Sequence, residues 1–177
     1  MDFAFPNNNE SEFVKIAAAL NIKDLVFVYT DPKSVKKVEG CKTALLVKPN
    51  KILSAKKIVD YVLVKSEGND RFVLEKGKPD FLFGFEFWSE KDHMRQRASG
   101  LNKILCVLAK KNKVKLLFSF SDFLSLPSYR KSLILGRIMQ NKMLCEKYKV
   151  DYELVSLART PHHLRKKNDL DSFFKSL

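Results

Sequence analysis

Short apolar segments alternate with helical segments along the whole chain, and this alternation is the feature that most limits the possible folds. Each apolar segment is too uniformly hydrophobic to keep one face in water, which is typical of strands in a parallel sheet covered by helices. We expect such strands at Met1–Pro6, Asp24–Tyr29, Thr43–Val47, Tyr61–Val64, Asp80–Phe85, Val114–Phe120 and Tyr152–Leu157. Seven strands in this arrangement leave two architectures open, a doubly wound open sheet or a (β/α) barrel.

The predicted helices between these strands are unequal in length. The first helix is expected to begin after a cap at Asn9 or Ser11, because apolar residues at helical spacing follow. The later helices are expected at Ser54–Val59, Arg71–Glu75, Ser99–Lys111, Ser128–Lys149 and Asp169–Phe174. The short, even repeat of the first half, and the lack of a glycine-rich phosphate-binding motif after any strand, favour the barrel.

The expected fold class is therefore α/β. We predict a small, distorted TIM-like (β/α) barrel with about seven parallel strands alternating with helices. A chain of 177 residues, 45% of them hydrophobic, can bury one core of ordinary size. One domain over residues 1–177 is expected.

Basic side chains are concentrated in one part of the chain. Residues 1–90 hold 14 basic and 13 acidic side chains, residues 91–167 hold 18 and five, and residues 168–177 hold one and two. The middle block thus carries a net charge equal to the +13 of the whole chain. Such a concentration favours a polyanionic partner over a surface that is merely solvated. No apolar run is long enough to cross a bilayer, so we expect a cytoplasmic protein with no membrane partner.

Residue types that often carry catalysis occur without their usual spacing. Cys41, Cys106 and Cys145 form no C-x-x-C pair, so buried free thiols are expected rather than disulfides or structural zinc. The three histidines form no metal-binding pair, and the adjacent His162 and His163 are expected to have a capping or surface role. No G-x-S-x-G motif indicates a nucleophilic serine.

Acidic side chains at the predicted strand ends are candidate catalytic groups, because barrel enzymes place such groups there. Asp31 and Asp122 follow two of the strands. Each stands alone among ordinary turn residues, so we interpret both as helix caps or turn formers.

Two basic segments are better candidates for function. Arg95 and Arg97 lie just before a predicted helix, whose free N–H groups attract phosphate, so this segment is either a phosphate clamp or a solvated loop. Arg159 and Arg165 lie in a loop after the last strand. Loops at one end of a barrel converge, so the two clusters could meet.

Four stretches together form a more specific pattern. They are Arg97–Leu105, Ala109–Val114, Phe118–Ser121 and Leu157–Leu170, and the Ser-Gly-Leu-Asn helix start and the Ala-Arg-x-Pro ending are the most specific parts. This pattern resembles ribonuclease P protein component 3, and the likeness spans nearly the whole chain. The sequence departs from that family in being short and in having His162-His163 after the proline.

The resemblance implies a role in ribonuclease P, the ribonucleoprotein endonuclease that removes the 5′ leader of precursor tRNA. It implies a distorted barrel that binds the ribonuclease P RNA and pairs with ribonuclease P protein component 2 in a heterotetramer, touching precursor tRNA only indirectly. Catalysis would belong to the RNA and its Mg²⁺, so the protein itself would bind no cofactor. The long helix at 128–149 is a candidate partner surface, although covering the barrel is its expected duty.

The resemblance also selects residues for RNA binding. Arg97, Asn102, Arg159 and Arg165 occupy motif positions. Arg95, Lys103, Lys48 and Lys65 are added because of their charge and their places near strand ends. No catalytic or metal-binding residue is expected.

Two other functions stay open. The family is similar to metal-dependent phosphoesterase barrels, but the histidine ligands of their first strand are absent from Asp2–Pro6. A generic RNA-binding protein fits the charge equally well.

Overall fold

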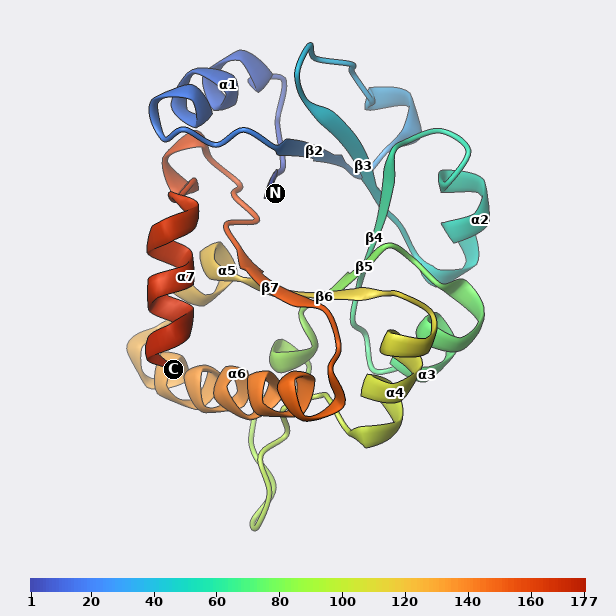
Figure 1. The fold of residues 1–177 in the computed structure, drawn as a ribbon, viewed down its shortest axis with the longest axis vertical. Coiled ribbons are helices and arrows are strands. Elements are labelled where there is room, and N and C mark those ends of the chain that lie inside the picture. The colour runs from blue at the N-terminus through green and yellow to red at the C-terminus, as the bar shows by residue number, and fades with distance from the viewer.

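The computed structural model describes all residues, 1–177, as a parallel barrel of seven strands with helices on its outside (Figure 1). Each strand pairs in parallel with the next one in the chain, in the order β1 to β7. The strands are β1 Asp2–Ala4, β2 Leu25–Tyr29, β3 Lys42–Leu46, β4 Tyr61–Lys65, β5 Phe81–Phe83, β6 Lys115–Ser119 and β7 Tyr152–Val155. The predicted α/β barrel of about seven parallel strands is confirmed.

The ring closes through the residues that follow β7. The Ala158 N–H donates to the Phe3 carbonyl (2.9 Å), and the Phe5 N–H donates to the Ala158 carbonyl (2.8 Å). The carboxylate of Asp2 accepts a further bond from the Ser156 N–H at 2.7 Å. The barrel is therefore nearly closed, with a short irregular segment in place of an eighth strand.

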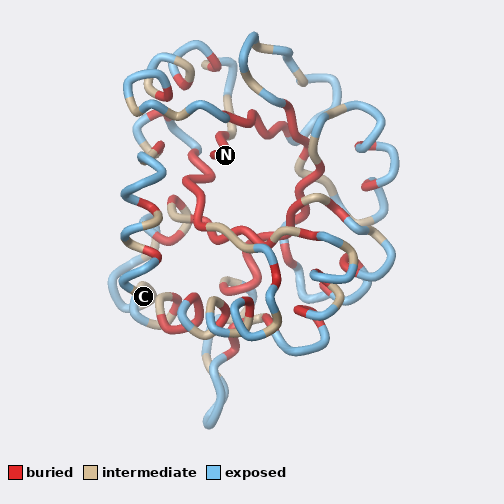
Figure 2. The backbone as a smooth tube through the Cα atoms, viewed as in Figure 1, coloured by how far each residue is buried: buried red, intermediate tan, exposed pale blue.

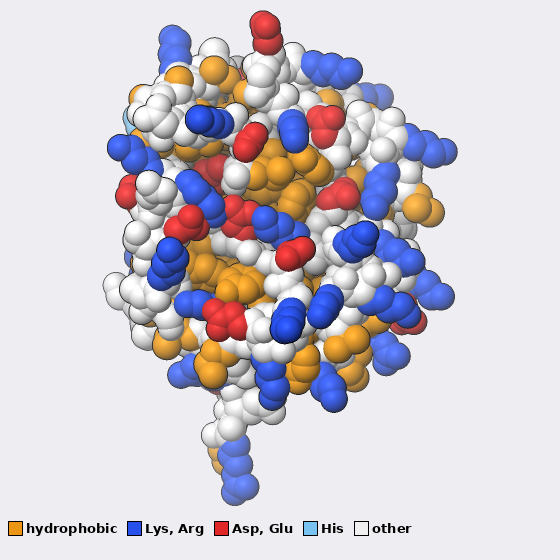
Figure 3. Space-filling view, in the orientation of Figure 1, with side chains coloured by type: hydrophobic (Ala, Val, Ile, Leu, Met, Phe, Trp, Pro, Cys, Tyr) orange, Lys and Arg blue, Asp and Glu red, His pale blue; other side chains and the backbone are white.

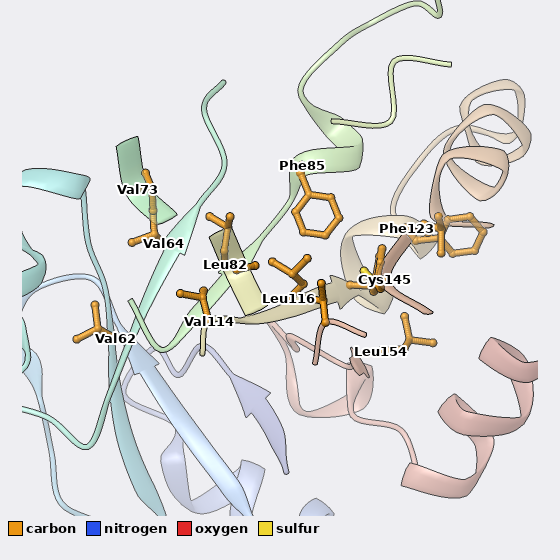
Figure 4. Close-up of a cluster of buried hydrophobic side chains, with 14 of the residues drawn as sticks. Val62, Val64, Val73, Leu82, Phe85, Val114, Leu116, Phe123, Cys145 and Leu154 are labelled. Carbon is orange, nitrogen blue, oxygen red and sulfur yellow. The ribbon is translucent and has the colours of Figure 1, made fainter. Parts of the chain in front are cut away.

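Apolar side chains fill two layers, one on each side of the strands, so the buried residues follow the ring in Figure 2. The barrel interior holds ten buried residues, including Phe3, Phe81 and Phe83. A larger cluster of 32 buried residues lies between the strands and the helices. Figure 4 shows part of this outer layer, with Val64, Leu82 and Leu116 pointing from neighbouring strands. Burial on both faces explains why the strands read as continuous apolar runs.

The helices connect the strands and cover the barrel. They are α1 Glu10–Ala19, α2 Ile52–Ala55, α3 Asp70–Phe72, α4 Lys103–Lys111, α5 Phe120–Leu124, α6 Ser128–Tyr148 and α7 Lys167–Ser176. Five short helical turns accompany them, at Pro32–Ser34, Pro49–Lys51, Val73–Gly77, Phe85–Phe87 and Pro161–His163. No helix is both long enough and apolar enough to span a membrane.

The start of α4 lies four residues from the predicted boundary, as does the end of α2, and helix α5 was not predicted. We expected α4 to begin at Ser99, but it begins at Lys103, with the Asn102 side chain accepting from the Leu105 N–H at 3.0 Å. Gly100 has a φ of +84°, outside the helical range. The preceding residues belong to a long connection between β5 and α4.

A projecting hairpin, Ser89–Arg97, forms the outer part of that connection, and we call it the finger (Figure 1, yellow-green). Its arms are joined by bonds between the backbones of His93 and Gln96 (2.9 and 3.4 Å). Met94, at the turn between them, is 99% exposed. The finger therefore offers backbone and side chains to a partner well away from the barrel.

Candidate nucleic-acid interface

Three of the predicted basic residues lie at the end of the barrel where the strands end. Lys48 follows β3, Lys65 is the last residue of β4, and Arg159 follows the segment that closes the barrel. All three are exposed. Because side chains alternate along a strand and Leu63 faces the interior, Lys65 lies at the mouth of the barrel.

Arg159 is held in place by two neighbours. Its Nη2 lies 3.3 Å from the Oδ1 of Asp122, and its guanidinium lies over the Phe5 ring, 5.3 Å from the centroid. The interpretation of Asp122 as a turn former missed this ion pair, whereas Asp31 does cap a helical turn by accepting from the Lys33 N–H at 2.9 Å. The Arg159 side chain is 56% exposed, so the pair adds little stability and leaves the guanidinium free to contact phosphate.

The finger carries Arg95 and Arg97 in different situations. Arg95 is exposed at the turn and makes no hydrogen bond within the chain. Arg97 folds back onto α6, where its Nη1 donates to the Gly136 carbonyl at 2.8 Å. A Cβ on Gly136 would lie 2.9 Å from the guanidinium carbon, so the glycine makes room for this contact.

Asn102 and Lys103 lie at the start of α4. Asn102 uses its side-chain oxygen as the helix cap, and both residues are exposed. The first N–H groups of a helix favour anions, and Lys103 adds a positive charge beside them. Basic side chains also ring the periphery of the molecule and reach the tip of the finger in Figure 3.

Arg165 lies apart from these residues. Its Nη1 donates to the carbonyls of His162 and Leu164, at 2.7 and 2.8 Å. Its side chain lines a cavity with Asp2 and Asp24, at the end of the barrel where the strands begin. Arg159 and Arg165 therefore belong to opposite ends, and no hydrogen bond joins either of them to the finger. From the sequence we expect the cluster with Arg95 and Arg97 to meet the cluster with Arg159 and Arg165. Arg165 does not lie where such a meeting would require.

A buried arginine that the sequence analysis missed holds the finger to α6. Arg137 is fully buried; its Nε donates to the Asp92 Oδ1 at 2.8 Å, and its Nη1 donates to the carbonyls of Glu86 and Ser89. Burial alone would raise the pKa of Asp92, but bonds from the Ala98 N–H and from Arg137 hold it below its usual value. The finger thus has a fixed base.

Glu86 lies fully buried near the barrel mouth, and neither of its carboxyl oxygens has a hydrogen-bond partner. Burial raises its pKa to about 8, and the Asp122 carboxylate adds to this rise, against the lowering effect of the nearby backbone N–H groups of Glu86 and Ser119. A carboxyl group in this state is largely neutral at pH 7. No group of three or more His, Cys, Asp or Glu side chains is arranged to hold a metal ion.

His162 and His163 lie in a short helical turn, Pro161–His163. His162 is exposed, as a surface role requires, whereas His163 is half-buried and its Nδ1 has no partner. Cys106 and Cys145 are buried free thiols, as expected, and Cys41 is half-buried.

Comparison with solved structures gives an informative match. A chain from a cryo-EM structure of archaeal ribonuclease P with mature tRNA aligns over 99% of this chain and 81% of its own length. The TM-score is 0.76 at 18% sequence identity. The two chains share a fold.

The remaining comparisons add little. No protein-family model matches the sequence, and no curated protein matches it. The crystal structure of an uncharacterized protein aligns over 87% of this chain and 39% of its own, with a TM-score of 0.43 and 7% identity. A score this low does not establish a common fold.

Proposed function

We propose that this protein is a subunit of ribonuclease P, of the component 3 type, and that it acts in removing the 5′ leader of precursor tRNA. The observation that carries the proposal is the shared fold with a chain of archaeal ribonuclease P across 99% of the sequence. The resemblance of Arg97–Leu105 and Leu157–Leu170 to component 3 supports the same assignment from different evidence. Residues at motif positions and the overall fold thus favour one family.

The protein would act by binding and stabilising the catalytic RNA. Lys48, Lys65 and Arg159 offer positive charge at one end of the barrel, while Arg95 and Lys103 offer it at and near the finger. Their neutralisation of phosphate repulsion would favour the compact, active RNA and lower its requirement for Mg²⁺. Chemistry would be done by the RNA with its Mg²⁺, and the protein would have no independent activity.

A protein partner is part of the proposal. The component 3 resemblance implies pairing with component 2 in a heterotetramer, in the cytoplasm. Helix α6 mainly covers the barrel, since Ile134 and Ile138 are buried, but Met139 and Met143 on its outer side are 39% and 68% exposed. This outer side of α6 is the surface we assign to the partner.

The test is cleavage of precursor tRNA by reconstituted catalytic RNA and component 2 at limiting Mg²⁺, with and without this protein. We expect strong stimulation by the unaltered chain and a severalfold weaker effect of Arg159→Ala, because that variant loses a phosphate contact. Lys23→Ala is the matched control, because Lys23 is an exposed cation just before β2, at the opposite end of the barrel.

Two further assays, of binding to unrelated RNA and of phosphatase activity, would reveal the rival functions. Absence of stimulation, together with tight binding to unrelated RNA, would indicate a generic RNA-binding protein. Phosphatase activity that depends on added Mn²⁺ would indicate a phosphoesterase barrel. Both outcomes would overturn the assignment to ribonuclease P.

A further inference from the structure

A cavity of about 360 Å³ lies between the finger, the start of α4 and the segment that follows β4. Its volume is in the range of small-ligand pockets, about 300–1,000 Å³. Only four of its 14 lining residues are hydrophobic. A polar ligand is therefore better suited to it than an apolar one.

One wall of the cavity is Trp88, the only tryptophan of the chain. One side of the indole rests on the backbone of Gly68, where a Cβ would come within 2.6 Å of Nε1. Gly68 also has a φ of +86°, so both the backbone and the close approach require glycine. Trp88 is 61% exposed, so its supported ring offers a flat surface for stacking.

Asp70 lines the same cavity, and one oxygen of its buried carboxyl group has no partner within the chain. The residue is 5% exposed, and its Oδ2 accepts from the Ser66 hydroxyl at 2.6 Å. Its Oδ1 has no hydrogen-bond partner. Buried polar atoms nearly always have partners, so an orphaned carboxylate oxygen in a cavity wall points to a ligand with N–H or O–H donors.

Positively charged residues also line the cavity that contains Trp88 and Asp70. Arg71 and Arg97 are among the lining residues, as is Asn102 at the start of α4, although the Arg97 guanidinium also donates to the Gly136 carbonyl of α6. The Arg71 side chain is 71% exposed, with only a loose contact to Glu75 at 3.7 Å. An aromatic platform, a buried acceptor and flanking arginines match the base, the hydrogen-bonding edge and the phosphates of a nucleotide.

We propose that this cavity binds one unpaired nucleotide of an RNA, with its base stacked on Trp88 and the donor edge of that base on Asp70. The inference rests on the proposed function in naming RNA as the ligand. Guanine fits best, because its Watson–Crick edge presents adjacent N–H donors to a group that can only accept. Uracil, whose single N–H lies between two carbonyl oxygens, would face Asp70 with repulsive acceptors.

The surroundings favour a nucleotide within RNA over a free one. Arg95 on the finger and Lys103 at the start of α4 are exposed and directly adjoin the lining residues Gln96 and Asn102, so they could contact the flanking phosphates of a strand. No glycine-rich phosphate loop follows a strand to hold the terminal phosphates of a free nucleotide. Single-stranded RNA is bound in this way elsewhere, by stacking together with contacts to the backbone.

The fluorescence of Trp88 tests the proposal directly, because no other tryptophan contributes. The full chain is titrated with a short uridine RNA, with the same RNA carrying one central guanosine, with an RNA duplex of equal length, and with GMP. We expect saturable quenching by the guanosine RNA at about tenfold lower concentration than by the uridine RNA. The duplex is expected to bind through its phosphates without quenching.

Variants separate the two contacts. Asp70→Asn keeps an acceptor for Ser66 but puts an amide in place of the free oxygen, so the preference for guanosine should fall to about one. Trp88→Ala, followed by anisotropy of labelled RNA, should weaken binding about tenfold, and Trp88→Phe should restore most of it through its ring. Thermal unfolding of each variant shows that the fold is retained.

Three results would overturn the proposal. They are quenching by duplex and single strand alike, quenching by GMP as strong as by the guanosine RNA, and unchanged binding in Trp88→Ala. If any of these occurs while the chain still stimulates cleavage of precursor tRNA, the pocket assignment fails and the proposed function stands. Loss of stimulation by the unaltered chain would instead remove the proposed function.

Discussion

Three ionisable groups lie near the base of the finger and are accommodated differently: Glu86, Asp92 and Arg137. Arg137 is fully buried, and its Nε and Nη1 donate to Asp92 and to two carbonyl groups, although its Nη2 has no partner. Glu86 is equally buried but has no partner for either oxygen, and its pKa rises to about 8. Arg137 stabilises the fold through its contacts, whereas Glu86 costs stability whenever it ionises.

The stability of the protein should therefore fall as Glu86 loses its proton. The folded state holds this proton up to about pH 8 while the unfolded chain releases it near 4.5, so the folded state binds more protons across that window. Stability then decreases as pH rises through it, and the full cost remains above pH 8. Glu86→Gln, which stays neutral, should be more stable than the unaltered chain above pH 8 by on the order of 5 kcal/mol.

Thermal unfolding at a series of pH values measures this difference. Below the window, the variant and the unaltered chain should unfold at nearly the same temperature, because both side chains are then neutral. Parallel stability curves for the two proteins across the window would show that the raised pKa is wrong.

Replacing Arg137 should have a large effect on stability. Arg137→Met leaves Asp92 without its charged partner and two buried carbonyls without donors. We expect a loss of about 3 kcal/mol or more in the free energy of unfolding. Lys147→Met, at an exposed position of α6, is the control and should change it by less than about 0.5 kcal/mol. Equal effects of the two substitutions in urea unfolding would contradict the anchoring role.

At the scale of elements, the connection from β5 to α4 depends on one glycine. Gly100 has a φ of +84°, and a Cβ there would lie 2.2 Å from the Phe85 carbonyl oxygen. The connection must pass this close because Asn141 of α6 binds the Ser99 carbonyl at 2.7 Å. The finger and the cavity beside it are therefore placed by packing against α6.

Gly100→Ala and Gly40→Ala form a matched pair that separates steric conflict from backbone strain. Gly40 also has a positive φ, +74°, but nothing lies within 4 Å of its Cβ position. Each substitution should cost about 1 kcal/mol for the left-handed backbone. Gly100→Ala should cost clearly more in urea unfolding, because the backbone of Phe85 has to move. Similar losses for both would mean that the approach to Phe85 is not constraining.

The same connection marks where sequence reasoning succeeds and fails. The seven strands could be predicted because burial on both faces makes each one an apolar run in the sequence. The start of α4 could not, because Ser99 and Gly100 look like a helix beginning, and only contacts with α6 and Phe85 keep them out of it. Long-range packing overrides local preference here.

Candidate site residues divide in the same way. Lys48, Lys65 and Arg159 were identifiable because parallel strands bring their ends together. The fold-back of Arg165 and the buried position of Arg137 leave no local signal. An exposed sole tryptophan soon after a strand was a signal for Trp88, but its partner Gly68 lies 20 residues earlier and was visible only in the structure.

At the scale of the whole molecule, charge on the two ends of the barrel predicts how salt should affect RNA binding. Affinity should fall linearly on a plot of log K against log salt, because each neutralised phosphate releases counterions. Lys48→Ala and Lys103→Ala should each lower that slope by about one unit. Lys23→Ala, at the other end, should leave it unchanged. Filter-binding across salt concentrations measures the slopes, and three equal slopes would remove the assigned orientation.

Closure of the barrel by Asp2 and Ser156, 154 residues apart, also has a consequence for folding during synthesis. β1 is synthesised long before residues 156–158, and one edge of it has no partner until they emerge. Until then a growing sheet has two open edges, which can pair with other chains. Contacts of such long separation make folding slow. Closure of the barrel is therefore expected as a late step of folding, and a chain that has not reached it is the one most exposed to aggregation.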